Sequence, residues 1–197
     1  MRLSDRFQHA LLYAAELHAN QLRRGGEIPY LAHLLNVAGI ALDYGANENQ
    51  AIAALLHDAV EDQGGSATAA EIRRRFGDEV AELVLGCTDC DTVPKPAWKP
   101  RKEAFVAKLQ RATPGVALVV AADKLHNVRS LLQDFYAIGN DLWSRFNGGR
   151  EGTLWYYRAV ADAVQQGAPA ALAAELDRAV QQLEKLAREN PPAEILS

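Results

Sequence analysis

The sequence predicts an all-α protein with a single helical domain. Apolar residues recur at helical spacing along most of the chain, and stretches rich in glycine or proline separate the helical segments. Residues 116–120 have the β-branched content of a buried strand. The sequence offers no comparable second run to pair with it, and an isolated strand is not stable, so we expect a helix there too.

The first two helices are marked by their end residues. Ser4 suits the N-cap of a first helix, whose apolar stripe runs from Phe7 to His18. A basic loop containing glycine and proline follows, and a second helix is expected over residues 31–44. Gly45 suits the end of that helix, because glycine tolerates the left-handed conformation that is common there.

The remaining elements follow from the same reasoning. A third helix is expected over residues 48–62, ending at a Gly-Gly pair. Thr68 with Glu71 three residues later is a capping-box pattern, which predicts a helix that opens at Thr68 and runs to Phe76. Further helices are expected over residues 78–85, 101–112, 116–132, 152–165 and 169–189, with a loop over 91–100 and a loop or broken helix over 140–151.

Composition narrows the function classes. The chain has 197 residues and a net charge of -4, from 21 Lys and Arg against 25 Asp and Glu. A duplex nucleic-acid binder usually carries a basic excess, so we expect no nucleic-acid partner. The N-terminus lacks a signal-peptide pattern, and no apolar run is long enough to cross a bilayer. We therefore expect a cytoplasmic protein with no membrane partner.

The motif His-Asp-Ala-Val-Glu-Asp at residues 57–62 is the most informative part of the chain, and it ends an apolar run. Burying ionisable groups without partners is costly, so four of them here indicate chemistry rather than packing. On a helix, residues three or four apart share a face, so His57 and Asp58 lie near Glu61 and Asp62. The arrangement suits a bound cation with acid/base groups beside it, which predicts an enzyme.

Two further residues extend this possible metal site. His33 lies on an otherwise apolar helix, and Asp123 follows an apolar run as His57 does. Taken singly, His33 suits a packed core histidine and Asp123 suits an internal ion pair. Together with His57 and Asp58 they form a set of two imidazoles and two carboxylates, which suits Mn²⁺, Fe²⁺ or Zn²⁺ better than Ca²⁺. The acidic pair that follows Asp58 then remains free to orient or deprotonate a water.

Three stretches carry a resemblance to a known family. They are residues 23–33 (RRGGEIPYLAH), 54–62 (ALLHDAVED) and 122–129 (ADKLHNVR). Their combined pattern resembles the HD-domain phosphohydrolases. More narrowly, it resembles the alarmone hydrolases of the RelA/SpoT type, including the small stand-alone hydrolases such as the metazoan one. The similarity extends from the first helix to about residue 165.

This resemblance implies a fold, an activity and a set of site residues. It implies an HD-type domain over residues 1–165, with residues 166–197 as a C-terminal helix and tail of the same domain. The implied activity is removal of the 3′-pyrophosphate from a guanosine or adenosine alarmone, with a nucleotide as partner and Mn²⁺ as cofactor. The implied residues are His33, His57, Asp58 and Asp123 for the metal, Glu61 and Asp62 for catalysis, and Arg23, Arg24, Asn127, Ser130 and Tyr156 for the substrate. The oligomeric state is left open.

The chain departs from the family pattern at two positions near the nucleotide. Leu34 stands where the family usually has proline, and Ile28 extends the Gly-Glu-Pro-Tyr turn. Both departures leave the metal site intact, but the choice between guanine and adenine stays open. We also expect no synthetase domain to follow. The alternatives are a phosphatase of the same site that acts on NADPH or another nucleotide, and a non-catalytic nucleotide-binding module.

Other reactive groups have plainer interpretations. Cys87 and Cys90 are expected to be partly buried thiols, and the arginines at 73–75 to form a solvated helix face. His126 is expected to pack rather than to bind a metal. A basic set is expected at the surface, in a segment that could lie over a polyphosphate: Lys95, Lys99, Arg101 and Lys102.

Overall fold

A computed structural model describes residues 2–90 and 94–191 of the chain. Its elements are α1 (Asp5–Leu17), α2 (Tyr30–Asp43), α3 (Glu48–Leu56), α4 (Ala59–Asp62), α5 (Gly65–Phe76), α6 (Asp78–Cys87), α7 (Trp98–Leu109), α8 (Pro114–Ile138), the 3₁₀ helix η1 (Gly139–Arg145), α9 (Gly149–Val164) and α10 (Ala170–Glu189). Within the two described ranges, β-type pairing is limited to one isolated bridge between Leu22 and Pro29. The all-α prediction is therefore confirmed.

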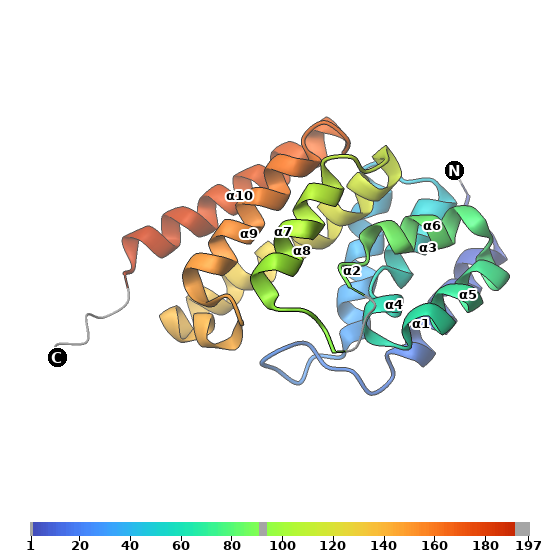
Figure 1. Cartoon of the computed structure of the whole chain (residues 1–197), viewed down its shortest axis with the longest axis horizontal. Helices are drawn as coiled ribbons and strands as arrows, with labels where there is room; N and C mark the ends of the chain where they lie inside the picture. The colour runs from blue at the N-terminus through green and yellow to red at the C-terminus, as the bar shows by residue number, and fades with distance from the viewer. Residues whose placement is uncertain (1, 91–93, 192–197) are drawn as a thin grey trace.

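Helix α8 is the centre of the fold. It contacts α2, α3 and α6 on one side and α9, α10 and η1 on the other. In Figure 1 the N-terminal helices (blue to green) and the C-terminal pair α9 and α10 (orange to red) lie on opposite sides of it. Because both sides are covered, residues 116–122 are buried all round, which explains a run that is apolar on every face. Thr113 caps the helix by accepting from the Val116 N–H, and Pro114 occupies its first turn.

The helix expected over residues 48–62 is interrupted, so that prediction is wrong in detail. Helix α3 ends at Leu56 and α4 begins at Ala59, which leaves His57 and Asp58 at the break. The Nδ1 atom of His57 lies 2.8 Å from the Ala54 carbonyl oxygen, which an unbroken helix would use for the Asp58 N–H. This competition between a side chain and the backbone ladder accounts for the break. His57 and Asp58 therefore lie at the junction, and Glu61 and Asp62 lie on the short helix α4.

Other predicted boundaries also differ. Helix α5 begins at Gly65 rather than at Thr68, because Gly64 (φ 124°) and Gly65 (φ 59°) turn the chain at positive φ. Thr68 lies inside the helix and donates its hydroxyl to the Gln63 carbonyl at 2.6 Å, so the predicted capping box does not form. Of the loop expected over 91–100, residues 91–93 lie outside the described residues, and 98–100 already belong to α7. A proline in a first helical turn is compatible with that start.

Helix α10 packs along α8 and α9 through one apolar face. Its buried residues are Leu172, Ala173, Leu176, Val180, Leu183 and Ala187, and they belong to the same core as the rest of the described chain. On its flank, Arg158 of α9 donates to Asp177 at 2.6 Å and to Glu184 at 2.9 Å. Over the part of the chain that is described, none of the helices has both the length and the apolar character needed to span a membrane.

Candidate active site

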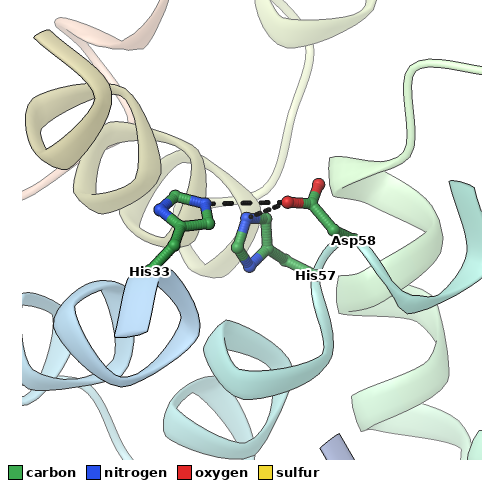
Figure 2. Close-up of side chains that lie close together, drawn as sticks. All are labelled: His33, His57 and Asp58. Carbon is green, nitrogen blue, oxygen red and sulfur yellow. Dashed lines mark ion pairs between the residues drawn. The ribbon is translucent and has the colours of Figure 1, made fainter. Parts of the chain in front are cut away.

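Four side chains meet where α2, α8 and the α3–α4 junction come together. His33 comes from α2, His57 and Asp58 from the junction, and Asp123 from α8. The two imidazole Nε2 atoms point at the same carboxylate oxygen, Oδ2 of Asp58, at 3.6 Å from His33 and 3.0 Å from His57 (Figure 2). Oδ1 of Asp123 lies 3.3 Å from Nε2 of His33 and 3.7 Å from Nε2 of His57. We call these four residues the donor cluster.

In both imidazoles of the donor cluster, the Nδ1 atom faces away from the cluster and has a hydrogen-bond partner there. Nδ1 of His57 faces the Ala54 carbonyl, and because a carbonyl oxygen can only accept, Nδ1 carries the hydrogen. In the neutral form of this imidazole, the lone pair on Nε2 is directed into the cluster. Nδ1 of His33 lies 2.8 Å from Nδ1 of His126. Among the residues that the structure describes, the buried Nε2 atoms of His33 and His57 find no hydrogen-bond partner.

This arrangement fits a divalent cation. One ligand atom from each of His33, His57 and Asp58 lies within 4.8 Å of the others. Buried polar atoms without partners are costly, and a cation between them would satisfy both Nε2 atoms. Asp123 stands beside this trio, with Oδ1 accepting from the Asn127 amide at 2.5 Å and Oδ2 paired with Lys124 at 2.5 Å. The mixed imidazole and carboxylate set suits a borderline transition metal.

Charge within the donor cluster outweighs burial. Burial works to lower the pKa of His57, but the Asp58 and Asp123 carboxylates raise it well above its usual value. Burial likewise opposes ionisation of Asp58, yet His57 and His33 hold the pKa of that carboxyl well below its usual range. Against the same burial, Lys124 and the two histidines lower the pKa of Asp123. The cluster therefore favours ionised carboxylates, the form that binds a cation, beside a protonated His57, and a cation bound there would displace the proton from Nε2.

Tyr30 is a member of the site that sequence analysis did not single out. Its hydroxyl donates to Oδ2 of Asp58 at 2.5 Å, and its ring stacks on His18 at 5.3 Å between centroids. Burial and the Asp58 charge raise the pKa of Tyr30, so it remains a donor. Tyr30 precedes His33 by three residues, and this helical spacing is the signal that could have identified it.

Glu61 and Asp62 of α4 lie at the edge of the cluster and line the same cavity. Glu61 pairs with Lys95 at 2.8 Å, and Oδ2 of Asp62 accepts from the Gln21 amide at 2.8 Å. The oxygen of the Gln21 amide accepts from the Gln63 amide at 2.6 Å. This second hydrogen bond orients Gln21 so that its NH₂ group faces Asp62. Burial and the nearby Asp58 charge raise the pKa of Asp62. Asp62 is therefore placed to hold or release a proton.

A cavity of about 770 Å³ opens above the donor cluster and is lined by positive side chains. We call these side chains the basic wall: Arg23, Arg24, Lys95, Arg101, Lys102, Lys124 and Arg145. Arg23 connects the wall to the floor, because it donates to Asn127 at 3.0 Å and to Ser130 at 3.3 Å while Asn127 donates to Asp123. Arg24 donates to the Arg145 carbonyl at 2.9 Å. All five residues expected to contact substrate thus line this cavity, including Tyr156.

The expectation of a surface position is wrong for Arg101 and Lys102. Their side chains are 12% and 16% exposed, and both pair with Asp89, whose side chain is 4% exposed. A buried carboxylate requires partners, and Asp89 therefore draws both cations inward. Lys102 lies 4.7 Å from the ring of Tyr156. Lys99, one turn earlier on α7, is 47% exposed and does agree with the prediction.

The plainer interpretations hold elsewhere. Cys87 and Cys90 are both partly buried, and burial raises the pKa of the Cys87 thiol. The arginines at 73–75 are exposed on α5. His126 does more than pack, since it touches His33, and burial and His33 lower its pKa to about 4. Ile28 is 58% exposed at the cavity, whereas Leu34 is fully buried.

An all-α fold with two buried imidazoles and carboxylates at the floor of a basic cavity defines a helical protein with a candidate divalent-metal centre. A family model described as the HD domain matches residues 10–154. The chain therefore belongs to the HD-domain family, as its motifs predict.

Sequence comparison shows which HD-domain proteins this chain is similar to. The chain is 40% identical over 131 residues to the guanosine-3′,5′-bis(diphosphate) 3′-pyrophosphohydrolase of Aquifex aeolicus, with 65% of this chain and 18% of that protein covered. It is 40% identical over 126 residues to a probable GTP pyrophosphokinase of Mycobacterium leprae, with 63% and 16% covered. The chain thus spans less than a fifth of the length of these relatives.

Two solved structures have a similar fold over nearly their whole length. One is described as a metazoan ortholog of SpoT that hydrolyses ppGpp, with a TM-score of 0.79, 29% identity, and 93% of this chain and 98% of that chain covered. The other is a Listeria monocytogenes protein with a TM-score of 0.68, 33% identity, and 78% and 99% covered. The predicted resemblance to RelA/SpoT-type proteins is confirmed by these matches.

Proposed function

We propose that this chain is a Mn²⁺-dependent phosphohydrolase that removes the 3′-pyrophosphate from a guanosine or adenosine alarmone. The observation that carries the proposal is the pair of buried Nε2 atoms, from His33 and His57, that converge on Asp58 beneath a basic cavity. The Aquifex relative is named for this activity, and the similar metazoan structure is described as hydrolysing ppGpp. Both support the same substrate class.

In this proposal His33, His57, Asp58 and Asp123 hold the metal. Imidazole and carboxylate ligands suit Mn²⁺ and its neighbours in the transition series. A divalent ion bound there would lower the pKa of water and polarise a phosphoryl oxygen. Tyr30 keeps Oδ2 of Asp58 directed into the cluster through its hydroxyl, as outer partners of metal ligands do.

Glu61 and Asp62 handle protons. Water forms a bond to the phosphorus attached to O3′, the P–O3′ bond breaks, and the products are pyrophosphate and a 3′-hydroxyl. One proton leaves the water and one is taken up by O3′. Asp62 suits the exchange because burial and Asp58 raise its pKa, which brings it closer to neutral pH than an ordinary carboxyl. Gln21 donates to one oxygen of Asp62, and the other oxygen lies 4.0 Å from Nζ of Lys95, which also lines the cavity.

The basic wall binds the nucleotide. A cavity of about 770 Å³ falls within the range of small-ligand sites. Arg23 and Arg24 suit phosphates or a base, since a planar guanidinium can bind in a fork or stack. Asn127 and Ser130 are already joined to Arg23, and Tyr156 lies beneath Lys102. These five residues therefore form the proposed substrate contacts.

We also propose that residues 1–165 and the C-terminal segment 166–197 form one domain. The apolar face of α10 belongs to the same buried core as α8 and α9. Arg158 adds ion pairs across the α9–α10 contact. A separate unit would instead have a core of its own.

The test is a substrate panel with product identification. Purified protein is incubated with Mn²⁺ and 3′-diphosphate nucleotides of guanosine and adenosine, and separately with NADPH and deoxynucleotides. The proposal predicts pyrophosphate from at least one 3′-diphosphate nucleotide and none from a His57→Ala variant. Orthophosphate from NADPH or a deoxynucleotide, without pyrophosphate from any alarmone, favours a phosphatase instead. Binding of an alarmone without any product favours a non-catalytic module.

A further inference from the structure

His126 contacts His33 on the side of the ring that faces away from the donor cluster, and this contact joins two polar nitrogens rather than apolar atoms. It lies on α8 three residues after Asp123, and its Nδ1 is 2.8 Å from Nδ1 of His33. The ring centroids are 4.9 Å apart, and the rings are tilted by 43°. Two imidazole nitrogens at this distance share one hydrogen, because one must donate and the other must accept.

The direction of this hydrogen bond decides whether His33 can bind a cation. Nε2 of His33 faces Asp58 and Asp123, at 3.6 and 3.3 Å. A metal there needs the Nε2 lone pair, which requires the hydrogen of a neutral His33 to sit on Nδ1. His33 must then donate, and His126 must accept with its own hydrogen on Nε2. Nδ1 of His126 contacts Nδ1 of His33, whereas the cluster is contacted by Nε2 of His33. His126 is therefore a partner of a cluster residue through Nδ1 and not a member of the cluster.

The two cluster imidazoles are held by different kinds of acceptor. Nδ1 of His57 faces the Ala54 carbonyl, which can never donate, so its tautomer is fixed by the backbone. Among the described residues, the hydrogen-bond partner of the His33 Nδ1 is His126, a side chain with two tautomers of its own. One ligand is therefore oriented by the main chain, and the other depends on a replaceable residue.

We propose that His126 is a positioning residue that accepts the Nδ1 hydrogen of His33 and thereby keeps Nε2 of His33 available as a metal ligand. The inference rests on the metal site of the proposed function and assigns His126 no contact with substrate. Partners of this kind fix the ring orientation and tautomer of metal-binding histidines, and their loss typically weakens metal binding by about 10- to 100-fold.

Two substitutions separate this role from packing. His126→Phe keeps an aromatic ring on α8 and removes the acceptor. His126→Asn keeps an acceptor, because the amide oxygen lies close to the place of Nδ1. His9→Phe serves as a control, since His9 is exposed on α1. Thermal unfolding of all four proteins shows whether each variant is folded before its metal binding is compared.

Metal affinity is the first measurement, made by calorimetric titration with Mn²⁺ and without any nucleotide. The proposal predicts that His126→Phe binds Mn²⁺ on the order of 10- to 100-fold more weakly than wild type. His126→Asn is expected to recover most of this loss, and His9→Phe to match wild type. Equal affinities for wild type and His126→Phe would overturn the proposal, and so would equal losses in the Phe and Asn variants.

The tautomer of His33 is the second measurement, read from ¹⁵N-labelled histidine by NMR in the metal-free protein and with Zn²⁺ as a diamagnetic probe. The wild-type Nδ1 of His33 is expected to be protonated in both samples, and a mixture of tautomers is expected for metal-free His126→Phe. An unprotonated Nδ1 in wild type contradicts the proposal. The NMR result on metal-free protein stands independently of any activity, so a failed substrate panel leaves it intact. Wild type that binds no metal contradicts this inference and the proposed metal site together.

Discussion

The donor cluster and the basic wall face the same cavity but are built in different ways. The cluster residues lie on the packed helices α2 and α8 and at the α3–α4 junction, and the histidines among them are almost fully buried. The wall comes from the loop before α2, from Lys95 ahead of α7, from the start of α7, and from α8 and η1, and its side chains are held mainly by ion pairs. Buried imidazoles beside carboxylates suit chemistry, whereas cations that line a cavity suit binding of a charged ligand. The two regions should therefore respond differently to substitution.

The largest effect is expected from removing a cluster carboxylate. Asp58→Ala takes away the oxygen on which both imidazoles converge. Turnover should fall by more than the ~10⁴-fold that loss of a single acid/base group reaches, because the metal itself is lost. Metal content after purification and pyrophosphate release measure the two losses together. An Asp58→Ala protein with wild-type metal content would separate this carboxylate from the metal site.

A smaller effect, confined to turnover, is expected from Asp62→Asn. The amide keeps the shape of the carboxyl and its place beside Gln21 but cannot take up a proton. We expect kcat to fall about 10²- to 10⁴-fold, with Mn²⁺ affinity unchanged. Steady-state kinetics with a parallel metal titration checks this. A matching loss of metal affinity would instead make Asp62 part of the donor cluster.

The basic wall should show the opposite pattern. Lys102→Met removes a charge but keeps most of the side-chain length, so KM should rise about tenfold with kcat within a factor of about two. Lys99→Met is the matched control, because Lys99 lies one turn earlier on α7 and is exposed. Steady-state measurement of KM and kcat for both variants checks this prediction. A drop in kcat for Lys102→Met would place this lysine in the chemistry and break the division between the two regions.

The smallest effect is expected from Ile28→Ala at the mouth of the cavity. Ile28 is largely exposed, so the loss of its side chain should change KM by less than about tenfold. The ratio of the guanosine and adenosine substrates is the quantity to follow, with metal affinity as the control. An unchanged ratio would remove Ile28 from base selection.

Sequence patterns predicted the donor cluster well because each of its residues is marked locally. His57 and Asp123 each follow an apolar run, and His33 lies on the neighbouring apolar helix, so helix packing brings them together. The break after Leu56 was not predictable from periodicity. It depends on the ring of one residue competing for a backbone carbonyl, which helical spacing does not encode.

The basic wall was harder to predict because its members are placed by contacts distant in sequence. Arg101 and Lys102 read as surface charge until Asp89, more than ten residues earlier, is seen to be buried beside them. Arg23 is fixed by Asn127 and Ser130, about a hundred residues later. Tyr30 and His126 were within reach of sequence reasoning, since each lies three residues from a predicted ligand on the same helix.

The most direct test of the account is a metal titration of activity. Metal-free wild-type protein receives increasing Mn²⁺, and pyrophosphate released from a 3′-diphosphate nucleotide is measured at each point. The account predicts that activity rises with added metal and saturates at one equivalent per chain, with no comparable rise for Asp58→Ala. Pyrophosphate release that is independent of metal, or that saturates equally in the variant, would contradict a catalytic metal held by the donor cluster.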